Sequence, residues 1–306
     1  MRFESAIGWS AALGYAAVSA FARVFVEKAG NKLDPYLVLL VSLLIANVFF
    51  HTINLHKLRH IYQKVSKHKK DWCYVMLVTG VLWGSFFLGP HYISADDYTI
   101  IVFAATGFLA VMIYFYEDKR HPWITLTVAL LYIAALYLAV QNETLTYQHL
   151  IGFGIALTSG IASYFFLIFS SRLQIKSGLS TSATLAVRWW LAIGVVFLLC
   201  FNKLGELSQI APPQYIPILL PTFLGIIIPV YLAQTAAVKI GAQLAAIIQS
   251  VTPFFTVLVA MGLTITHFPL MDIFASILIM LAVVLFQIPF YQKRVTVQAH
   301  PPTSSS

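Results

Sequence analysis

One charged residue, Arg188, lies within the almost wholly apolar stretch 183–200, "ATLAVRWWLAIGVVFLLC". It falls about eight residues inside a predicted membrane helix (180–201), roughly 12 Å deep at about 1.5 Å per residue. A charge at the centre of such a helix costs about 2.5–3.5 kcal/mol. The planar guanidinium suits two carboxylate oxygens, so Arg188 is a candidate for binding an anionic substrate. Two alternatives stay open: the side chain snorkels to the interface, or it pairs with backbone carbonyls at a helix end.

Uncharged polar and aromatic side chains fall at the middle of other predicted membrane helices. Aromatic walls with a few placed polar groups are typical of small-molecule cavities. Each such residue taken alone is more often a packing residue. Taken together, we expect them to line a central substrate cavity with Arg188: Tyr15, Trp83, Tyr164, Tyr231, Gln234 and Gln249.

The sequence places no carboxylate deep within a predicted membrane helix, so the usual intramembrane proton relay is not expected. Asp96 and Asp97 come closest, at the start of a helix predicted for 97–116, and His91 precedes them. If they line an outer vestibule, these residues could attract cations or take up a proton. The structural alternative is that the two carboxylates stabilise the helix N-terminus and that His91 is an interfacial residue.

Metal and cofactor chemistry is not indicated. The histidines between residues 51 and 68 have no helix-spaced carboxylate or cysteine partners, so we predict no metal site. A phosphate-binding loop that would indicate direct ATP drive is also missing from the sequence. We therefore expect neither a metal nor a cofactor.

The composition predicts the elements that must position these residues. The chain has 306 residues, of which 59% are hydrophobic and 10% are charged, against about 25% charged in soluble domains. Apolar runs of about 20 residues recur along its length, and in lipid such runs are helices. We predict an all-α integral membrane protein with ten transmembrane helices: 5–26, 35–54, 72–92, 97–116, 123–141, 149–171, 180–201, 214–236, 242–264 and 270–290.

Basic residues in the short loops predict the orientation. With both termini in the cytoplasm, three basic residues fall outside (Lys28, Lys32 and Lys203) and fourteen fall inside, as the positive-inside rule requires. The inner set is Arg2, Lys57, Arg59, Lys64, Lys67, Lys69, Lys70, Lys119, Arg120, Arg172, Lys176, Lys239, Lys293 and Arg294. The most basic stretch, 56–71, could bind RNA or lipid. We favour a cytoplasmic loop that sets topology beside anionic headgroups, and we expect no nucleic-acid partner.

The chain divides into two halves of similar layout. A shift of 146 residues keeps all five predicted helices of residues 1–146 in phase with those of 147–292, and a polar tail, 293–306, is expected to be disordered in the cytoplasm. Because each half has an odd number of helices, the second half enters the membrane from the opposite side. Inverted five-helix repeats of this kind are typical of secondary transporters, with the substrate near the midplane.

Four small-residue-rich stretches resemble one transporter family: residues 14–50, 157–173, 185–199 and 231–265. They are similar to the EamA family of the drug/metabolite transporter superfamily, in its first two helices, the opening of its second repeat, and its eighth and ninth helices. The resemblance implies a ten-helix carrier of small metabolites, most often an exporter, in a bacterial inner membrane.

Four positions depart from that family's usual pattern. Asp96 and Asp97 stand where small residues are usual, Gly107 stands where a proline is expected, and Ser42 stands where an arginine is usual. Arg188 keeps the equivalent position in the second half.

We therefore expect a secondary transporter rather than an enzyme, moving a small metabolite such as an amino acid, outward, by alternating access. The alternatives are an uptake permease of the same fold and an integral-membrane enzyme acting on lipid. The expected partners are a small-molecule substrate and the lipid bilayer, and a homodimer is left open.

Overall fold

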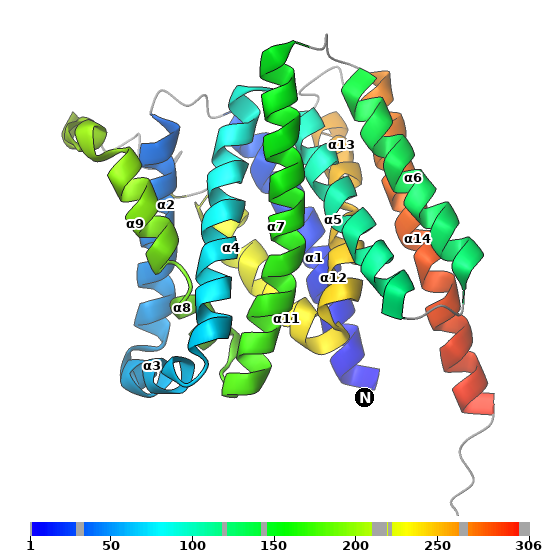
Figure 1. Ribbon diagram of the computed structural model, residues 1–306, viewed down its shortest axis with the longest axis horizontal. Coiled ribbons are helices and arrows are strands. Elements are labelled where there is room, and N and C mark those ends of the chain that lie inside the picture. The colour runs from blue at the N-terminus through cyan, green and yellow to red at the C-terminus, as the bar shows by residue number, and fades with distance from the viewer. Residues whose placement is uncertain are drawn as a thin grey trace, which may run out of the picture.

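Helices make up every regular element in the part of the chain that the computed structural model describes, residues 2–28, 34–117, 121–141, 146–209, 219, 222–262 and 269–299. Ten of the described helical segments are long and apolar enough to cross a membrane. This confirms the predicted all-helical class and the number of spans, and it indicates a multi-pass membrane protein. Residues 214–218, 220 and 221 of the predicted eighth span, and 263 and 264 of the ninth, lie outside the described residues. The helices run side by side between two faces (Figure 1).

The first five spans and their connections occupy residues 2–141. They are α1 (Arg2–Lys28), α2 (Pro35–Ile53), η1 (Leu55–Lys57), α3 (Leu58–Ser66), α4 (Lys69–Leu88), η2 (Gly89–His91), α5 (Ala95–Glu117) and α6 (Pro122–Gln141).

The second five spans follow from Tyr147. They comprise α7 (Tyr147–Ser177), α8 (Thr181–Ala186), α9 (Trp190–Leu199), η3 (Phe201–Gln209), the π-helical η5 (Thr222–Ile227), α11 (Ile228–Ile240), α12 (Ala242–Gln249), α13 (Thr252–Gly262) and α14 (Leu270–Ala299).

Two helices extend beyond their predicted ends. Helix α7 continues six residues past 171, until Gly178 takes up a left-handed conformation with φ of 58° and ends it. Helix α14 continues to Ala299, so residues 293–299 of the predicted tail are helical. Pro301 and Pro302, residues of a type that disfavours a helix interior, follow in the sequence and lie outside the described residues.

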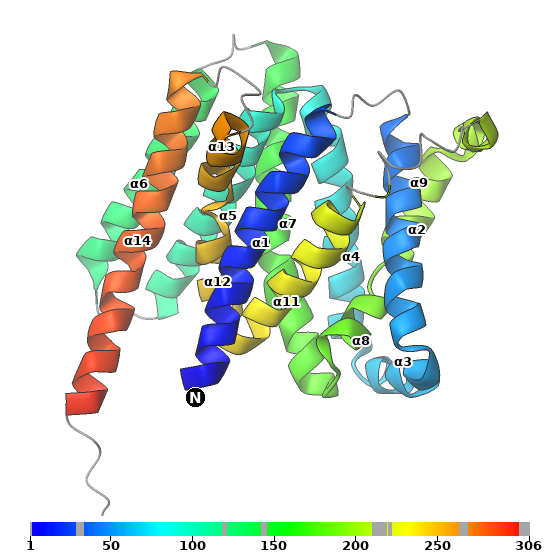
Figure 2. The ribbon, with the colours of Figure 1, turned by 180° about the vertical axis from the view of Figure 1, so that it is seen from behind.

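The start of α1 and the last turn of α14 lie at the same end of the bundle (Figures 1 and 2). Helix α3 also lies at this end, which we call the terminal face; the opposite end, where α5 and α14 begin, is the distal face. Helix α3 falls within the basic stretch predicted as a loop. It buries Ile61 and Val65 while Arg59 stays exposed, so this stretch is an amphipathic helix across the terminal face.

Two of the ten spans are broken. Span seven is interrupted at Val187–Trp189, between α8 and α9. Proline and glycine are absent there, but the indole Nε1 of Trp72 donates a hydrogen bond of 2.8 Å to the Val187 carbonyl. That carbonyl therefore has a partner outside the helix.

The second break, at Ser250–Val251, separates α12 from α13. Pro253 follows it, and a proline ring clashes with the carbonyl four residues earlier, here that of Gln249. The proline is tolerated because it lies in the first turn of α13.

The break in span nine is tied to α6 through one tyrosine. Ser250 donates its hydroxyl proton to the Ile247 carbonyl at 2.6 Å. The Tyr132 hydroxyl, 2.7 Å from that of Ser250, must therefore be the donor in the bond between them. A Cβ at Gly107 would lie 2.4 Å from the Tyr132 hydroxyl oxygen, so a glycine is needed for this ring to reach Ser250.

Helices α5 and α7 approach each other closely at Gly160. A Cβ at Gly160 would lie 2.6 Å from the Val102 carbonyl oxygen. Thr106 uses this proximity and donates a hydrogen bond of 3.0 Å to the Gly160 carbonyl. At Gly160 the first and second halves of the chain are therefore joined both by packing and by a hydrogen bond.

Candidate functional site

Arg188 lies in the break of span seven and has no exposed surface. Its guanidinium carbon is 4.5 Å from the ring centroid of Phe166 on α7 and 4.2 Å from that of Trp189. Both aromatic rings attract the cation through their quadrupoles. The break in the helix, rather than a helix surface, thus presents this side chain to the interior.

The guanidinium has no hydrogen-bond acceptor among the described residues. Nε, Nη1 and Nη2 of Arg188 are all buried and without a partner. An arginine carries five N–H donors, and a buried charge is normally paired because desolvation is costly. The aromatic contacts compensate only in part, so the guanidinium keeps hydrogen-bond donors that no described residue satisfies.

Two tryptophans add donors beside the arginine. The indole rings of Trp83 on α4 and Trp189 lie with their centroids 6.3 Å apart. Each Nε1 is buried without a hydrogen-bond partner, as is the hydroxyl of Thr79, one turn before Trp83. The cluster of Trp83, Phe166, Arg188 and Trp189, which we call the arginine site, therefore holds several unpaired donors.

Of the predicted cavity residues, Trp83 and Arg188 come together in the arginine site. Gln234 lies in a separate polar chain between α7, α8 and α11. Its Oε1 accepts from Ser170 at 2.6 Å, and its Nε2 donates to Gln174 at 2.7 Å. Gln174 in turn donates to Thr181 at 3.2 Å. Since the oxygen and the nitrogen of the Gln234 amide both have partners, these hydrogen bonds connect α7, α8 and α11.

Gln249 lies at the end of α12, beside the break in span nine. It is 3% exposed, and its Nε2 has no hydrogen-bond partner. It therefore has a free donor next to a break, as Arg188 has, but in the other broken span.

The three predicted tyrosines lie in different surroundings. Tyr164 is fully buried in the larger hydrophobic core. Tyr15 packs edge-on against Phe103, with ring centroids 6.3 Å apart. Tyr231 is 45% exposed on α11. The structure does not bring these three residues into the arginine site.

The predicted vestibule residues lie at the distal face. His91 is exposed in η2, and Asp97 is buried at the start of α5. The Ser94 hydroxyl donates to the Asp97 carboxylate at 2.6 Å and accepts from the Asp97 backbone N–H at 3.0 Å. This reciprocal arrangement caps α5, so Asp97 stabilises the helix N-terminus, the structural alternative given above for this residue.

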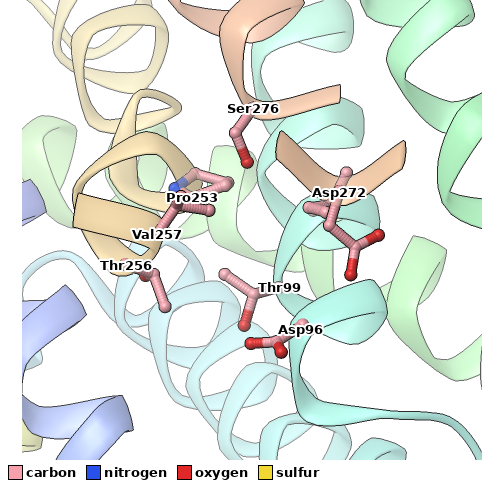
Figure 3. A pocket seen from close by; sticks show the side chains of 8 residues that line it. Asp96, Thr99, Pro253, Thr256, Val257, Asp272 and Ser276 are labelled. Atoms are coloured by element: carbon pink, nitrogen blue, oxygen red, sulfur yellow. The ribbon is translucent and has the colours of Figure 1, made fainter. Parts of the chain in front are cut away.

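Asp96 faces a pocket that the sequence did not reveal. The pocket lies between α5, α13 and α14 and is partly open to solvent, and the cavity within it is about 10 Å³, roughly what one water molecule needs. Figure 3 shows its labelled side chains around a common space, and Ile100 completes the lining: Asp96, Thr99, Ile100, Pro253, Thr256, Val257, Asp272 and Ser276. We call it the distal pocket. Asp272 and Ser276 were missed, although their spacing of four residues places both on one face of α14.

The fold has a counterpart among solved structures. One of them, described only as the crystal structure of a protein, matches with a TM-score of 0.66 and 12% sequence identity, over 95% of this chain and 99% of that chain. At this identity the likeness concerns the fold alone. No protein-family model and no curated protein matches the sequence. Function has to be argued from the side chains.

Proposed function

We propose that the protein is a secondary transporter that moves a small carboxylate-bearing metabolite, such as an amino acid, by alternating access. The observation that carries the proposal is Arg188, fully buried in a helix break with all three guanidinium nitrogens unpaired. A carboxylate would give this fork two acceptor oxygens, and the Trp83 and Trp189 indoles are further donors. The substrate therefore supplies the charge that the protein lacks.

The broken spans support a carrier. Secondary transporters commonly place the substrate between discontinuous helices, with half-helix N-termini toward anionic groups. Helix α9 begins at Trp190, two residues after Arg188, and the first N–H groups of a helix have no partner within it. Its positive end adds to the attraction of an anion.

The packing supports an inverted repeat with halves 1–146 and 147–292. Helix α4, the third span of the first half, packs along α7, the first span of the second half. Reciprocally, α11, the third span of the second half, packs along α1. The fifth spans, α6 and α14, pack on each other. This exchange of equivalent contacts is what a two-fold relation between the halves would produce.

The direction and the location follow from the resemblance to the EamA family. That resemblance favours export across a bacterial inner membrane, and the distribution of basic residues favours both termini in the cytoplasm. The terminal face carries the basic helix α3, as expected of a cytoplasmic face.

The proposal is tested with the full chain in proteoliposomes loaded with unlabelled amino acids and given ¹⁴C-labelled amino acids outside. We expect exchange of at least one amino acid, reduced tenfold or more by Arg188→Gln. The matched control is Arg172→Gln, because Arg172 is a half-exposed arginine paired with Asp71 at 3.4 Å; it should retain exchange.

Two results would count against the proposal. Absence of exchange for every amino acid and small carboxylic acid would contradict the carrier, and turnover of the vesicle lipid in the same samples would favour a membrane enzyme. Exchange that is unchanged in Arg188→Gln would remove this residue from the site.

A further inference from the structure

The distal pocket gathers oxygen atoms from two spans. Asp96 and Thr99 lie on α5, and Asp272 and Ser276 lie on α14, so two carboxylates and two hydroxyls face one space (Figure 3). Thr256 on α13 adds a third hydroxyl. The remaining lining residues, Ile100, Pro253 and Val257, offer only apolar side chains.

Ser276 is the observation that points to a ligand. It is 1% exposed, and its hydroxyl, which has no hydrogen-bond partner, is directed into the pocket (Figure 3). Leaving a buried hydroxyl unsatisfied costs free energy. A ligand in the pocket would remove that cost.

The other hydroxyls present lone pairs rather than protons. Thr99 donates its hydroxyl proton to the Ala95 carbonyl at 2.7 Å, and Thr256 donates its own to the Thr252 carbonyl at 3.1 Å. Both hydroxyl protons are therefore used within their own helices, and the Thr256 oxygen is an acceptor at the pocket. A ligand with positive charge is favoured by such a set, since carboxylates are acceptors too.

We propose that the distal pocket binds a sodium ion, which serves as the coupling ion of the carrier. All its polar side-chain groups are oxygens, which suit hard cations, whereas transition metals favour nitrogen or sulfur. Mg²⁺ gives up its water reluctantly, and the apolar walls leave little room for a hydrated ion. Carriers coordinate Na⁺ beside unwound segments of broken helices, and Pro253 belongs to the first turn after the break in span nine.

Because of where the pocket lies, a bound ion would restrain the movement of one helix segment. This role rests on the proposed transport function. One wall is α13, the half of span nine beyond the break, and the other walls are α5 and α14. A bound ion would hold α13 against these two helices and so fix its angle to α12. Because coupling free energies are reciprocal, a substrate that favours the same arrangement would tighten sodium binding.

The test measures ion binding without any solute, so its outcome does not depend on finding the transported metabolite. The full chain in detergent is titrated with ²²Na⁺, and its melting temperature is compared in sodium chloride and in choline chloride at equal ionic strength. We expect saturable sodium binding and a higher melting temperature in sodium.

Three variants test which residues bind the sodium ion. Loss of one neutral ligand in Ser276→Ala should weaken sodium binding about tenfold, equivalent to about 1.4 kcal/mol. Asp272→Asn should abolish the binding. Glu206→Gln is the control, because Glu206 is an exposed carboxylate in η3, outside the pocket, and it should bind sodium as the parent protein does.

The proposal is overturned if the parent protein binds no sodium, or if Ser276→Ala and Asp272→Asn bind it as tightly as Glu206→Gln. Binding of Ca²⁺ in place of Na⁺ would also overturn the assignment of the ion. If Asp272→Asn does not fold, the comparison between Ser276→Ala and the control still decides, since removal of one hydroxyl is a small change.

Discussion

Replacing Arg188 by methionine should make the ligand-free protein more stable. Methionine keeps an unbranched side chain in the space between Phe166 and Trp189 but removes the charge and the five unpaired N–H donors. This change separates the cost of burying the guanidinium from the benefit of the aromatic contacts.

The magnitude follows from two opposing terms. A charge at this depth costs about 2.5–3.5 kcal/mol. Leaving its nitrogens without acceptors adds about 1–3 kcal/mol. The two ring contacts, at 4.5 and 4.2 Å, are buried and return about 2 kcal/mol each. The middle of these ranges gives a net gain on substitution of about 1 kcal/mol. For a chain of this size that corresponds to a rise in melting temperature of about 2–4 °C.

The assay is thermal unfolding of the purified protein in detergent, followed by tryptophan fluorescence, with and without amino acids. Arg172→Met is the matched control. Its side chain is 56% exposed, so it should change the melting temperature little. Arg188→Met should also lose any stabilisation that an amino acid gives to the parent protein.

A fall of several degrees in Arg188→Met would refute the reasoning. It would show that the guanidinium stabilises the ligand-free fold without an anionic ligand. Retention of ligand-induced stabilisation in this variant would refute it as well.

Three further predictions concern contacts away from the arginine site. Tyr132→Phe removes the hydrogen bond to Ser250 and should lower the free energy of unfolding by about 1 kcal/mol, measured by thermal unfolding. Gln234→Leu leaves both hydrogen-bonded neighbours of that amide unsatisfied and should cost about 2–4 kcal/mol in the same assay. Although burial raises the pKa of Asp34, the hydrogen bond and charge of Lys203 and backbone hydrogen bonds lower it, so that the net pKa lies below 3.8. The stabilising effect of that ion pair is thus fully present above pH 3.8 and declines as the pH falls through the lower folded-state pKa; the difference in melting temperature between the parent protein and Asp34→Asn should shrink over that range. Equal melting temperatures at neutral pH would contradict the last prediction.

The spans could be predicted from the sequence because apolar length alone determines them. The break in span nine has a local signal in the sequence, because Pro253 follows it by two residues and a proline interrupts a helix. The break in span seven has no such signal, because no proline or glycine lies there and the Val187 carbonyl bonds to Trp72, which is 115 residues away in the sequence. Interactions at such separations cannot be read from one sequence.

The sequence predicted the candidate site only in part, because it does not show which polar side chains at membrane depth already have hydrogen-bond partners in the fold. Arg188 and Trp83 stand out as polar groups at depth, and the structure places them together. Gln234 has the same appearance in the sequence, yet it is occupied by Ser170 and Gln174. Asp272 falls at the end of a predicted helix, where a carboxylate gives no signal of a site, and only the fold shows that it lines the same pocket as Asp96.

The contact between α5 and α7 limits how the molecule can move. At Gly160 the two backbones touch, and Thr106 bonds one to the other. If the two halves rock during transport, we expect the rotation axis to pass near this contact, because separating the helices here would break both their packing and a buried hydrogen bond. The largest displacements then belong to the segments remote from it, α2 and α9 on one flank and α6 and α14 on the other.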